Sequence, residues 1–208
     1  MDLYIIGAGN VGGFIAYHVK DMGTFQLKGF LDDDKSKHGK RLYDIPVVGF
    51  IDMLYNTSNE VAVVIAIANP LIKQQIVSKL KNNNLIHFPS FIHPSVWLGE
   101  KVRVGEGAII YPGVSINYES DIQDFSTINM NVAIGHNCLL GAYSTLAPGV
   151  NLGGFTSVGV ASFLGIGSST IQGVKIGENV TIGGMSMIIA SIPNGVTVVG
   201  NPGRIIKK

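Results

Sequence analysis

Two successive patterns of hydrophobic positions run along the chain, and they change near residue 88. Before that point, short apolar runs predict strands at residues 3–6, 26–31 and 61–67, and helical spacing predicts helices at 11–21 and 71–81. Strands separated by helices indicate a parallel sheet with right-handed crossovers. The segment 87–94 carries Pro89 and Pro94 and is typical of a connection. We therefore expect an α/β domain at 1–88 and a second domain at 89–208.

The second pattern repeats every six residues, and Thr170 alone interrupts its column of large aliphatic side chains. The column consists of Leu98, Val104, Ile110, Ile116, Ile122, Ile128, Ile134, Leu140, Leu146, Leu152, Val158, Leu164, Thr170, Ile176, Ile182 and Ile188. Two residues before each of these stands a small side chain, such as Ser, Val or Thr. One large and one small inward side chain in each six-residue rung predict a triangular parallel β-helix with eighteen residues per coil. An ordinary β-sandwich would not keep one phase over so many rungs.

Composition narrows the choice of partners. The 208 residues carry a formal net charge of +1, and apart from the final Lys207 and Lys208 no run of basic residues indicates binding to nucleic acid or to a membrane surface. The longest apolar run, 61–68, is far shorter than the roughly 20 residues that cross a bilayer, and the start lacks a basic signal-peptide region, so we expect a cytoplasmic protein. The single cysteine, Cys138, excludes an internal disulfide and a cysteine-rich zinc site, and its inward phase predicts a core position.

A glycine-rich turn follows the first predicted strand and opens the first predicted helix. Gly7, Gly9 and Gly12 have the spacing that brings a phosphate or ribose to backbone amides at a helix N-terminus. Asp32 lies twenty residues after Gly12, as an NAD ribose acceptor would. A dehydrogenase is the first alternative, but a dinucleotide fold needs two mononucleotide-binding halves and the 88 residues hold only one. A purely structural turn remains the other alternative.

His136 differs from the other four histidines because it lies in the repeat region, two residues after an inward Ile134 and so near an edge of the prism. The eighteen-residue coil stacks it against Gly154, whose missing side chain leaves a backbone amide and space beside the ring. A neutral imidazole next to a backbone donor suits acyl transfer. A γ-type carbonic anhydrase, the β-helix alternative, needs three histidines on zinc, and the repeats contain one.

Several motifs together resemble one family. They lie at residues 7–12, 29–34, 65–69, 135–138, 147–149 and 198–206, the last with the sequence Val-Val-Gly-Asn-Pro-Gly-Arg-Ile-Ile. The chain resembles the left-handed β-helix acyltransferases and, with its Rossmann-like start, the nucleotide-sugar acetyltransferases. These include sialic acid O-acetyltransferases, UDP-4-amino-sugar N-acetyltransferases and perosamine N-acetyltransferases. The resemblance implies a Rossmann-like half-domain, a left-handed parallel β-helix and a homotrimer with acetyl-CoA bound between neighbouring β-helices.

The resemblance also implies roles for individual residues. It makes His136 the catalytic base. Nucleotide-sugar contacts are expected at Gly9, Asn10, Val11, Gly12, Asp32, Asp33, Asn69 and Asn129. Acetyl-CoA contacts are expected at Thr145, Gly154, Ile166, Gly184, Asn201 and Pro202, and no metal is expected. The implied reaction is N-acetylation of a nucleotide-linked 4-amino sugar such as perosamine. The alternatives are an O-acetyltransferase of the sialic acid type and a non-catalytic scaffold or sugar-nucleotide-binding protein.

Three positions depart from the family pattern. Many relatives have histidine where Val11 stands, and some have histidine where Thr145 stands. Relatives usually place Glu or Asp directly after the catalytic histidine, whereas this chain has Asn137. The coil length puts Glu119 over Asn137 and Tyr118 over His136, so Glu119 is our candidate for the missing acid. A solvated surface glutamate is the simpler alternative.

Overall fold

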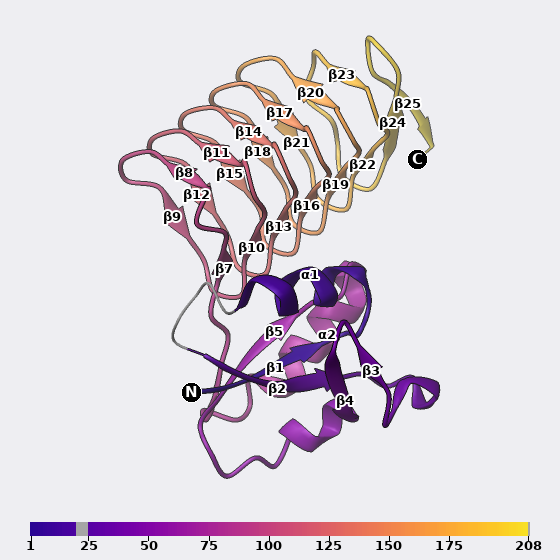
Figure 1. Cartoon of the computed structure of the whole chain (residues 1–208). Helices are drawn as coiled ribbons and strands as arrows, with labels where there is room; N and C mark the ends of the chain where they lie inside the picture. The colour runs from indigo at the N-terminus through magenta and orange to yellow at the C-terminus, as the bar shows by residue number, and fades with distance from the viewer. Residues whose placement is uncertain (20–24, 208) are drawn as a thin grey trace. The chain divides into compact units, whose positions relative to one another are not determined.

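A computed structural model describes residues 1–19 and 25–207. The chain forms two compact units, Met1–Phe91 and Ile92–Lys208, so the division falls three residues after the position expected from the sequence. Figure 1 shows a mixed unit of helices and strands, followed by a unit of stacked coils. None of the described helices is long and apolar enough to cross a membrane.

The first unit is built on a six-stranded sheet with the order β3-β4-β2-β1-β5-β6. Its strands are β1 (Asp2–Ile6), β2 (Gln26–Leu31), β3 (Arg41–Leu42), β4 (Ile45–Gly49), β5 (Val61–Ile65) and β6 (Ile86–His87). β1 lies between β2 and β5 and runs parallel to both, which confirms the parallel sheet. All five residues of β5 are buried, in agreement with its continuous apolar sequence.

Two α-helices connect these strands. The first, α1 (Asn10–His18), begins one residue before the predicted start, and its predicted end at Asp21 lies outside the described residues. The second, α2 (Pro70–Leu80), is one residue offset from the prediction at each end. It begins at Pro70, and the Asn69 side chain caps it by accepting hydrogen bonds from the amides of Leu71 (2.9 Å) and Ile72 (3.2 Å).

Several short elements of this unit were not predicted. They are β3, β4, β6 and the 3-10 segments η2 (Lys35–Lys37) and η3 (Ile51–Leu54). β3 and β4 form an antiparallel hairpin in which Tyr43 and Asp44 both have positive φ angles, 53° and 60°. The turn lacks the Asn-Gly, Asp-Gly or Gly-Gly pair that usually marks a two-residue hairpin, so the hairpin was not predicted.

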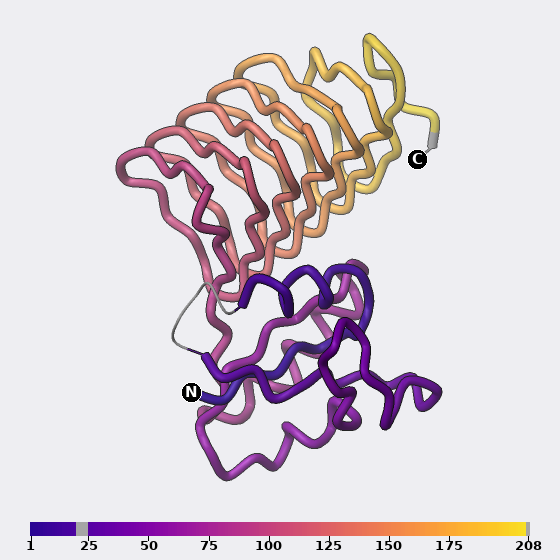
Figure 2. Tube along the Cα trace, viewed as in Figure 1, coloured from indigo at the N-terminus to yellow at the C-terminus, as the bar shows by residue number. Residues whose placement is uncertain are grey.

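The second unit is the predicted parallel β-helix, whose coils stack in sequence order (Figure 2). Three sheets form its walls. Sheet I contains β7 (Phe91–Ile92), β10 (Ile109–Ile110), β13 (Thr127–Ile128), β16 (Thr145–Leu146), β19 (Phe163–Leu164), β22 (Thr181–Ile182), β24 (Thr197–Val199) and β25 (Arg204–Lys207). Sheet II contains β8 (Trp97–Leu98), β11 (Ser115–Ile116), β14 (Ala133–Ile134), β17 (Asn151–Leu152), β20 (Ser169–Thr170) and β23 (Met187–Ile188). Sheet III contains β9 (Arg103–Val104), β12 (Asp121–Ile122), β15 (Leu139–Leu140), β18 (Ser157–Val158) and β21 (Lys175–Ile176).

The predicted aliphatic column supplies the second residue of each two-residue strand from β8 to β23, and from Ile110 onwards it is buried. Pairing confirms the eighteen-residue coil, since Ile116 pairs with Ile134 and Ile134 with Leu152. The one break, Thr170, is also buried. Its hydroxyl lies 2.9 Å from that of inward-facing Thr156, so two small polar side chains satisfy each other in the core. Cys138 is buried in the core, as predicted.

The corners between the sheets carry the surface chemistry. Corner II/III joins sheets II and III and contains residues 99–102, 117–120, 135–138, 153–156 and 171–174. Corner I/II joins sheets I and II and contains residues 111–114, 129–132, 147–150, 165–168 and 183–186. The two corners are separated by the width of sheet II, and six extended residues span at most about 20 Å.

Candidate active site

A crevice opens in the first unit where the carboxyl ends of β1, β2 and β5 meet. Gly7 follows β1 with a φ of +101°, a conformation that glycine adopts without strain. Gly12 lies in the first turn of α1, where a Cβ atom would come within 2.1 Å of the Gly7 carbonyl oxygen. Both glycines therefore have structural reasons to be present. Around Gly9, by contrast, an added Cβ would meet no atom within 4 Å.

A cavity of about 240 Å³ lies at this edge of the sheet. Its walls are formed by Gly7, Asp32, Asp33, Ile51, Tyr55, Ile67, Ile72, Gln75, Ile76 and Lys79. Three of these residues were not predicted as site residues: Tyr55, Gln75 and Lys79. Tyr55 directly follows η3, and the other two lie on α2, so only the tertiary fold brings them to the ends of the strands. The cavity thus combines apolar walls with an aromatic ring and charged groups of both signs, as small-molecule sites commonly do.

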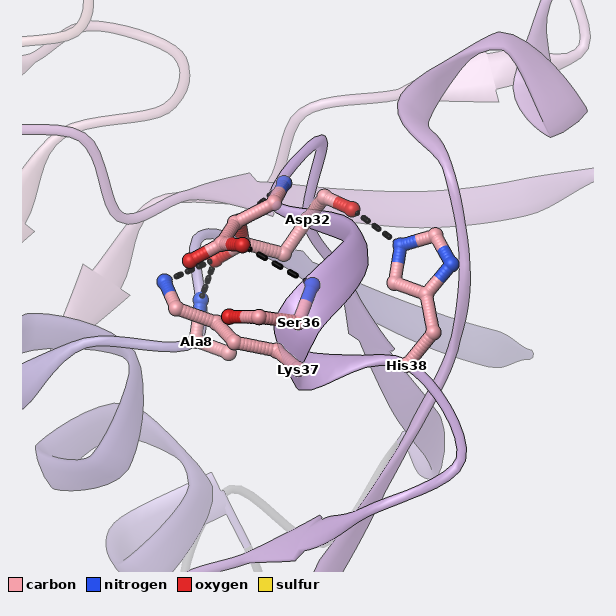
Figure 3. Close-up of polar contacts among 6 residues, drawn as sticks. Ala8, Asp32, Ser36, Lys37 and His38 are labelled. Carbon is pink, nitrogen blue, oxygen red and sulfur yellow. Dashed lines mark hydrogen bonds and ion pairs between the residues drawn. The ribbon is translucent and has the colours of Figure 1, made fainter.

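Asp32 lies immediately after β2, and its carboxylate accepts hydrogen bonds from neighbouring groups of the same chain (Figure 3). Oδ2 accepts hydrogen bonds from the Ala8 amide (2.9 Å) and the Lys37 ammonium (2.8 Å), and Oδ1 accepts one from the Asp34 amide (3.0 Å). Burial acts to raise the pKa of Asp32, but the bond from Lys37 and the two amides outweigh it and hold the pKa below its ordinary value. Asp32 therefore fixes the glycine turn to β2.

The remaining predicted substrate residues of this unit surround the same edge. Asp33 lines the cavity and accepts the Ile51 amide through Oδ1 at 3.2 Å. Asn10 accepts a hydrogen bond from the Tyr43 hydroxyl at 3.0 Å, and half-buried Val11 follows it on α1. Asn69 serves as the cap of α2.

In the second unit, half-buried His136 lies at corner II/III, and its neighbours on the adjacent coils are those that the eighteen-residue coil predicts. The ring of Tyr118 is stacked on it, with centroids 5.3 Å apart and an interplanar angle of 9°, and Phe155 meets it edge-on at 4.8 Å. Gly154 contacts the imidazole, since a Cβ atom there would lie 2.7 Å from Nε2. The predicted stacking of Tyr118, His136 and Gly154 is confirmed.

Asn137 orients the imidazole from the other side. His136 Nδ1 lies 2.9 Å from Asn137 Oδ1, and Asn137 Nδ2 donates to Glu119 Oε2 at 2.9 Å. Because Asn137 Oδ1 is an acceptor, the proton of the neutral ring lies on Nδ1. Nε2 is then left unprotonated on the side of Gly154. Glu119 contacts Asn137 as predicted, and Asn137 in turn contacts His136.

The structure places the other predicted residues of the β-helix away from His136. Asn129, Ile166 and Gly184 lie at corner I/II, and Thr145 lies on β16 of sheet I. Asn201 and Pro202 lie in the turn between β24 and β25. Gly154 is thus the one predicted acetyl-CoA residue that a single chain brings to the imidazole. Within residues 1–19 and 25–207, no cluster of three His, Cys, Asp or Glu side chains is arranged to hold a metal ion.

Comparison with known proteins identifies both units. A family model described as the PglD N-terminal domain matches residues 2–80, and one described as hexapeptide repeat of succinyl-transferase matches 131–154 and 156–188. The GDP-perosamine N-acetyltransferase of Escherichia coli O157:H7 is 31% identical over 152 residues, which cover 69% of this chain and 67% of the relative.

Two solved structures are similar over nearly the whole chain. The acetyltransferase domain of PglB from Neisseria gonorrhoeae, in complex with acetyl coenzyme A, has a TM-score of 0.89 and 30% identity, covering 99% of this chain and 98% of that one. PerB from Caulobacter crescentus, in complex with CoA and GDP-perosamine, also has a TM-score of 0.89 and 30% identity, covering 99% and 97%. Together with the hexapeptide coils, these similarities confirm the left-handed β-helix. The chain belongs to the hexapeptide-repeat nucleotide-sugar acetyltransferases and is an acetyl-CoA-dependent acetyltransferase.

Proposed function

We propose that this enzyme transfers the acetyl group of acetyl-CoA to the 4-amino group of a nucleotide-linked sugar, with perosamine as the favoured sugar. The main observation in support of this reaction is the orientation of His136. Its Nδ1 contacts Asn137, and its Nε2 lies beside the backbone of Gly154, which has no side chain. The name of the Escherichia coli relative and the GDP-perosamine in the PerB complex support the choice of sugar.

In the proposed reaction the amine nitrogen attacks the thioester carbonyl carbon. Nε2 of His136 takes a proton from that nitrogen as the new C–N bond forms, and the C–S bond then breaks. The departing CoA sulfur receives a proton, so the products are the N-acetylated sugar and CoA. The Gly154 amide is the proposed donor to the carbonyl oxygen.

The crevice of the first unit is the proposed nucleotide site. Gly9 and the first turn of α1 offer open backbone to a diphosphate, since a Cβ at Gly9 would meet nothing within 4 Å. The neighbouring cavity of about 240 Å³ suits a nucleobase, with Asp33 as an acceptor for its N–H groups. Asp32 contributes indirectly, because its carboxylate holds the glycine turn.

We also propose a homotrimer in which corner II/III of one protomer meets corner I/II of the next. The distribution of site residues supports it, because His136 and the predicted acetyl-CoA residues Ile166 and Gly184 lie on different corners. Corner I/II also exposes apolar side chains: Met130 is 42% exposed, Ile166 63% and Met185 75%. Closed threefold symmetry would cover this surface and complete three equivalent sites.

Mixing two inactive variants tests this arrangement. His136→Ala lacks the base, and Gly184→Trp is designed to obstruct the acetyl-CoA path at the other corner. If each site uses His136 from one protomer and Gly184 from the next, every mixed trimer contains one intact site. Random reassembly of equal amounts gives about three quarters mixed trimers, so roughly a quarter of wild-type activity returns. Light scattering is expected to report three times 22.1 kDa. A fully active monomer, or mixtures that regain no activity, would refute the shared site.

A substrate panel tests the acceptor. UDP-, GDP-, dTDP- and CMP-linked sugars, each with a 4-amino or a 4-hydroxyl group, are incubated with acetyl-CoA. The use of acetyl-CoA as the donor also supports our proposal that the enzyme is cytoplasmic. We expect CoA release with an amino sugar and a product that resists mild alkali, as an amide does. Turnover of hydroxyl acceptors alone would instead establish the O-acetyltransferase, and no turnover with any sugar would favour a binding protein.

A further inference from the structure

A row of hydrogen-bonded side chains crosses three coils of corner II/III and ends on His136. Lys101 donates to Glu119 Oε1 at 3.1 Å, Asn137 donates to Glu119 Oε2 at 2.9 Å, and Asn137 Oδ1 lies 2.9 Å from His136 Nδ1. The first three residues stand eighteen positions apart and share the left-handed conformation, with φ of 58°, 56° and 54°. The coil geometry thus stacks them directly above one another. We call them the Lys101–Glu119–Asn137 row.

The chemistry of Glu119 decides which way the Asn137 amide faces. The hydrogen bond from Lys101, then that from Asn137 and the charge of Lys101, hold the pKa of Glu119 below its ordinary value. Glu119 therefore stays ionised near neutral pH and can only accept hydrogen bonds. The NH₂ group of Asn137 must face it, which turns the amide oxygen toward His136.

The amide orientation in turn decides the tautomer of the imidazole. An oxygen opposite Nδ1 requires the proton on Nδ1 and leaves Nε2 unprotonated. A rotated amide would present its NH₂ group instead, so Nδ1 would become the acceptor and the proton would move to Nε2. In that state Nε2 cannot take a proton from the acceptor amine.

We propose that Glu119 and Lys101 are positioning residues of the acetyl transfer: Lys101 anchors Glu119, Glu119 fixes the amide of Asn137, and the fixed amide selects the reactive tautomer of His136. This inference rests on the proposed role of His136 as general base. It assigns a function to Lys101, a residue whose side chain is 74% exposed.

The test compares the row with a matched ion pair nearby. Arg103 and Asp121 also stand eighteen residues apart on the first coils and form an exposed bond of 2.9 Å, without contacting His136. We expect Glu119→Leu to lower kcat about 10- to 100-fold, the range found when a group that orients a metal-binding histidine is removed. Lys101→Met should lower it less, and the KM for acetyl-CoA should stay within about twofold. The controls Asp121→Leu and Arg103→Met should leave kcat nearly unchanged.

A second variant separates positioning from mere structural support. In Glu119→Leu/Asn137→Asp, the carboxylate at position 137 has no NH₂ group to present, so it accepts from Nδ1 without help from Glu119. We expect this double variant to recover most of the lost kcat. Selective ¹⁵N-histidine NMR should show Nδ1–H at His136 in the wild type and the double variant, and an increased Nε2–H population in Glu119→Leu.

Three results would overturn the proposal. They are a Glu119→Leu variant that keeps more than half of its kcat, an equal loss in Asp121→Leu, and a double variant no more active than Glu119→Leu. Failure of the underlying function is a different result, because it would appear as retained turnover in His136→Ala.

Discussion

Tyr118 and His136 lie face to face, one coil apart, with ring centroids separated by 5.3 Å and planes inclined by 9°. Together with Phe155 at the edge, the stacked ring restrains the imidazole on two sides. Asn137 restrains its remaining rotation through Nδ1. This corner therefore holds the imidazole in one orientation.

Replacing His136, the proposed general base, should greatly lower kcat and change acetyl-CoA affinity little. His136→Ala is expected to lower kcat by about 10² to 10⁴, the usual contribution of general base catalysis. Acetyl-CoA affinity, measured by calorimetry, should change little. His93→Ala is the control, because His93 lies before the repeats and is paired with Ser95. If His136→Ala kept more than half of the wild-type kcat, the imidazole would have no part in the mechanism.

Adding a methyl group at Gly154 should lower the activity that depends on the same corner. In Gly154→Ala the new Cβ would lie 2.7 Å from His136 Nε2, closer than any such contact in a folded protein. The ring must move, which breaks its alignment with Asn137. We expect kcat to fall about 10-fold or more with only a small change in thermal midpoint. Gly173→Ala one coil later, where a Cβ would meet no atom within 4 Å, is a positional control, although its φ of +74° adds some strain. Equal kcat losses in both variants would point to general damage of the corner.

The two neighbouring aspartates should respond differently to the loss of charge. Asp32→Asn weakens the bonds to the Ala8 amide and Lys37, so we expect it to lower the free energy of unfolding by about 1 kcal/mol or more. Asp33→Asn removes a charged acceptor from the cavity wall, and we expect the KM for the nucleotide sugar to rise about 10-fold. Urea unfolding and steady-state kinetics on both variants distinguish the roles. Identical behaviour of the two would contradict this division.

Lys73 gives a prediction about pH. Burial in α2 lowers its pKa from 10.5 to about 8, which means that the folded state disfavours the charged amine. Between about pH 8 and 10.5 the unfolded chain binds more protons than the folded one, so stability contributed by this group rises with pH through that window. The penalty at pH 7 is on the order of 3 kcal/mol. Lys73→Met should therefore be more stable than the wild type at pH 7, and the gap should narrow by pH 10. Lys79→Met, on the exposed face of α2, is the control.

The sequence predicted those parts of the fold that depend on regular periods. The six-residue period predicted the strands of the β-helix, and the eighteen-residue coil predicted that Glu119 contacts Asn137 and that Tyr118 stacks on His136. Thr170 interrupts the aliphatic column in the sequence, but the reason, a hydroxyl partner on Thr156, depends on two rungs that only the fold brings together.

Features built from single contacts were harder to predict. The hairpin at Tyr43 and Asp44 has no glycine, and the two-residue strands around it are too short to show a period. Asp32 matched the spacing of a ribose acceptor, yet its oxygens bind Ala8, Asp34 and Lys37. A spacing rule identifies where a side chain lies but not which neighbour takes its hydrogen bonds.

The eighteen-residue coil also determines which positions can supply a functional group to a given site. A position on this prism has two sets of neighbours, those beside it in the sequence and those one full turn away, about 4.8 Å above and below. In our proposal Glu119 acts on the position after His136 from one full turn away, a relationship that a linear alignment would treat as two unrelated positions. In proteins of this architecture, residues should be compared on a cylinder, where compensation across turns becomes visible as adjacency.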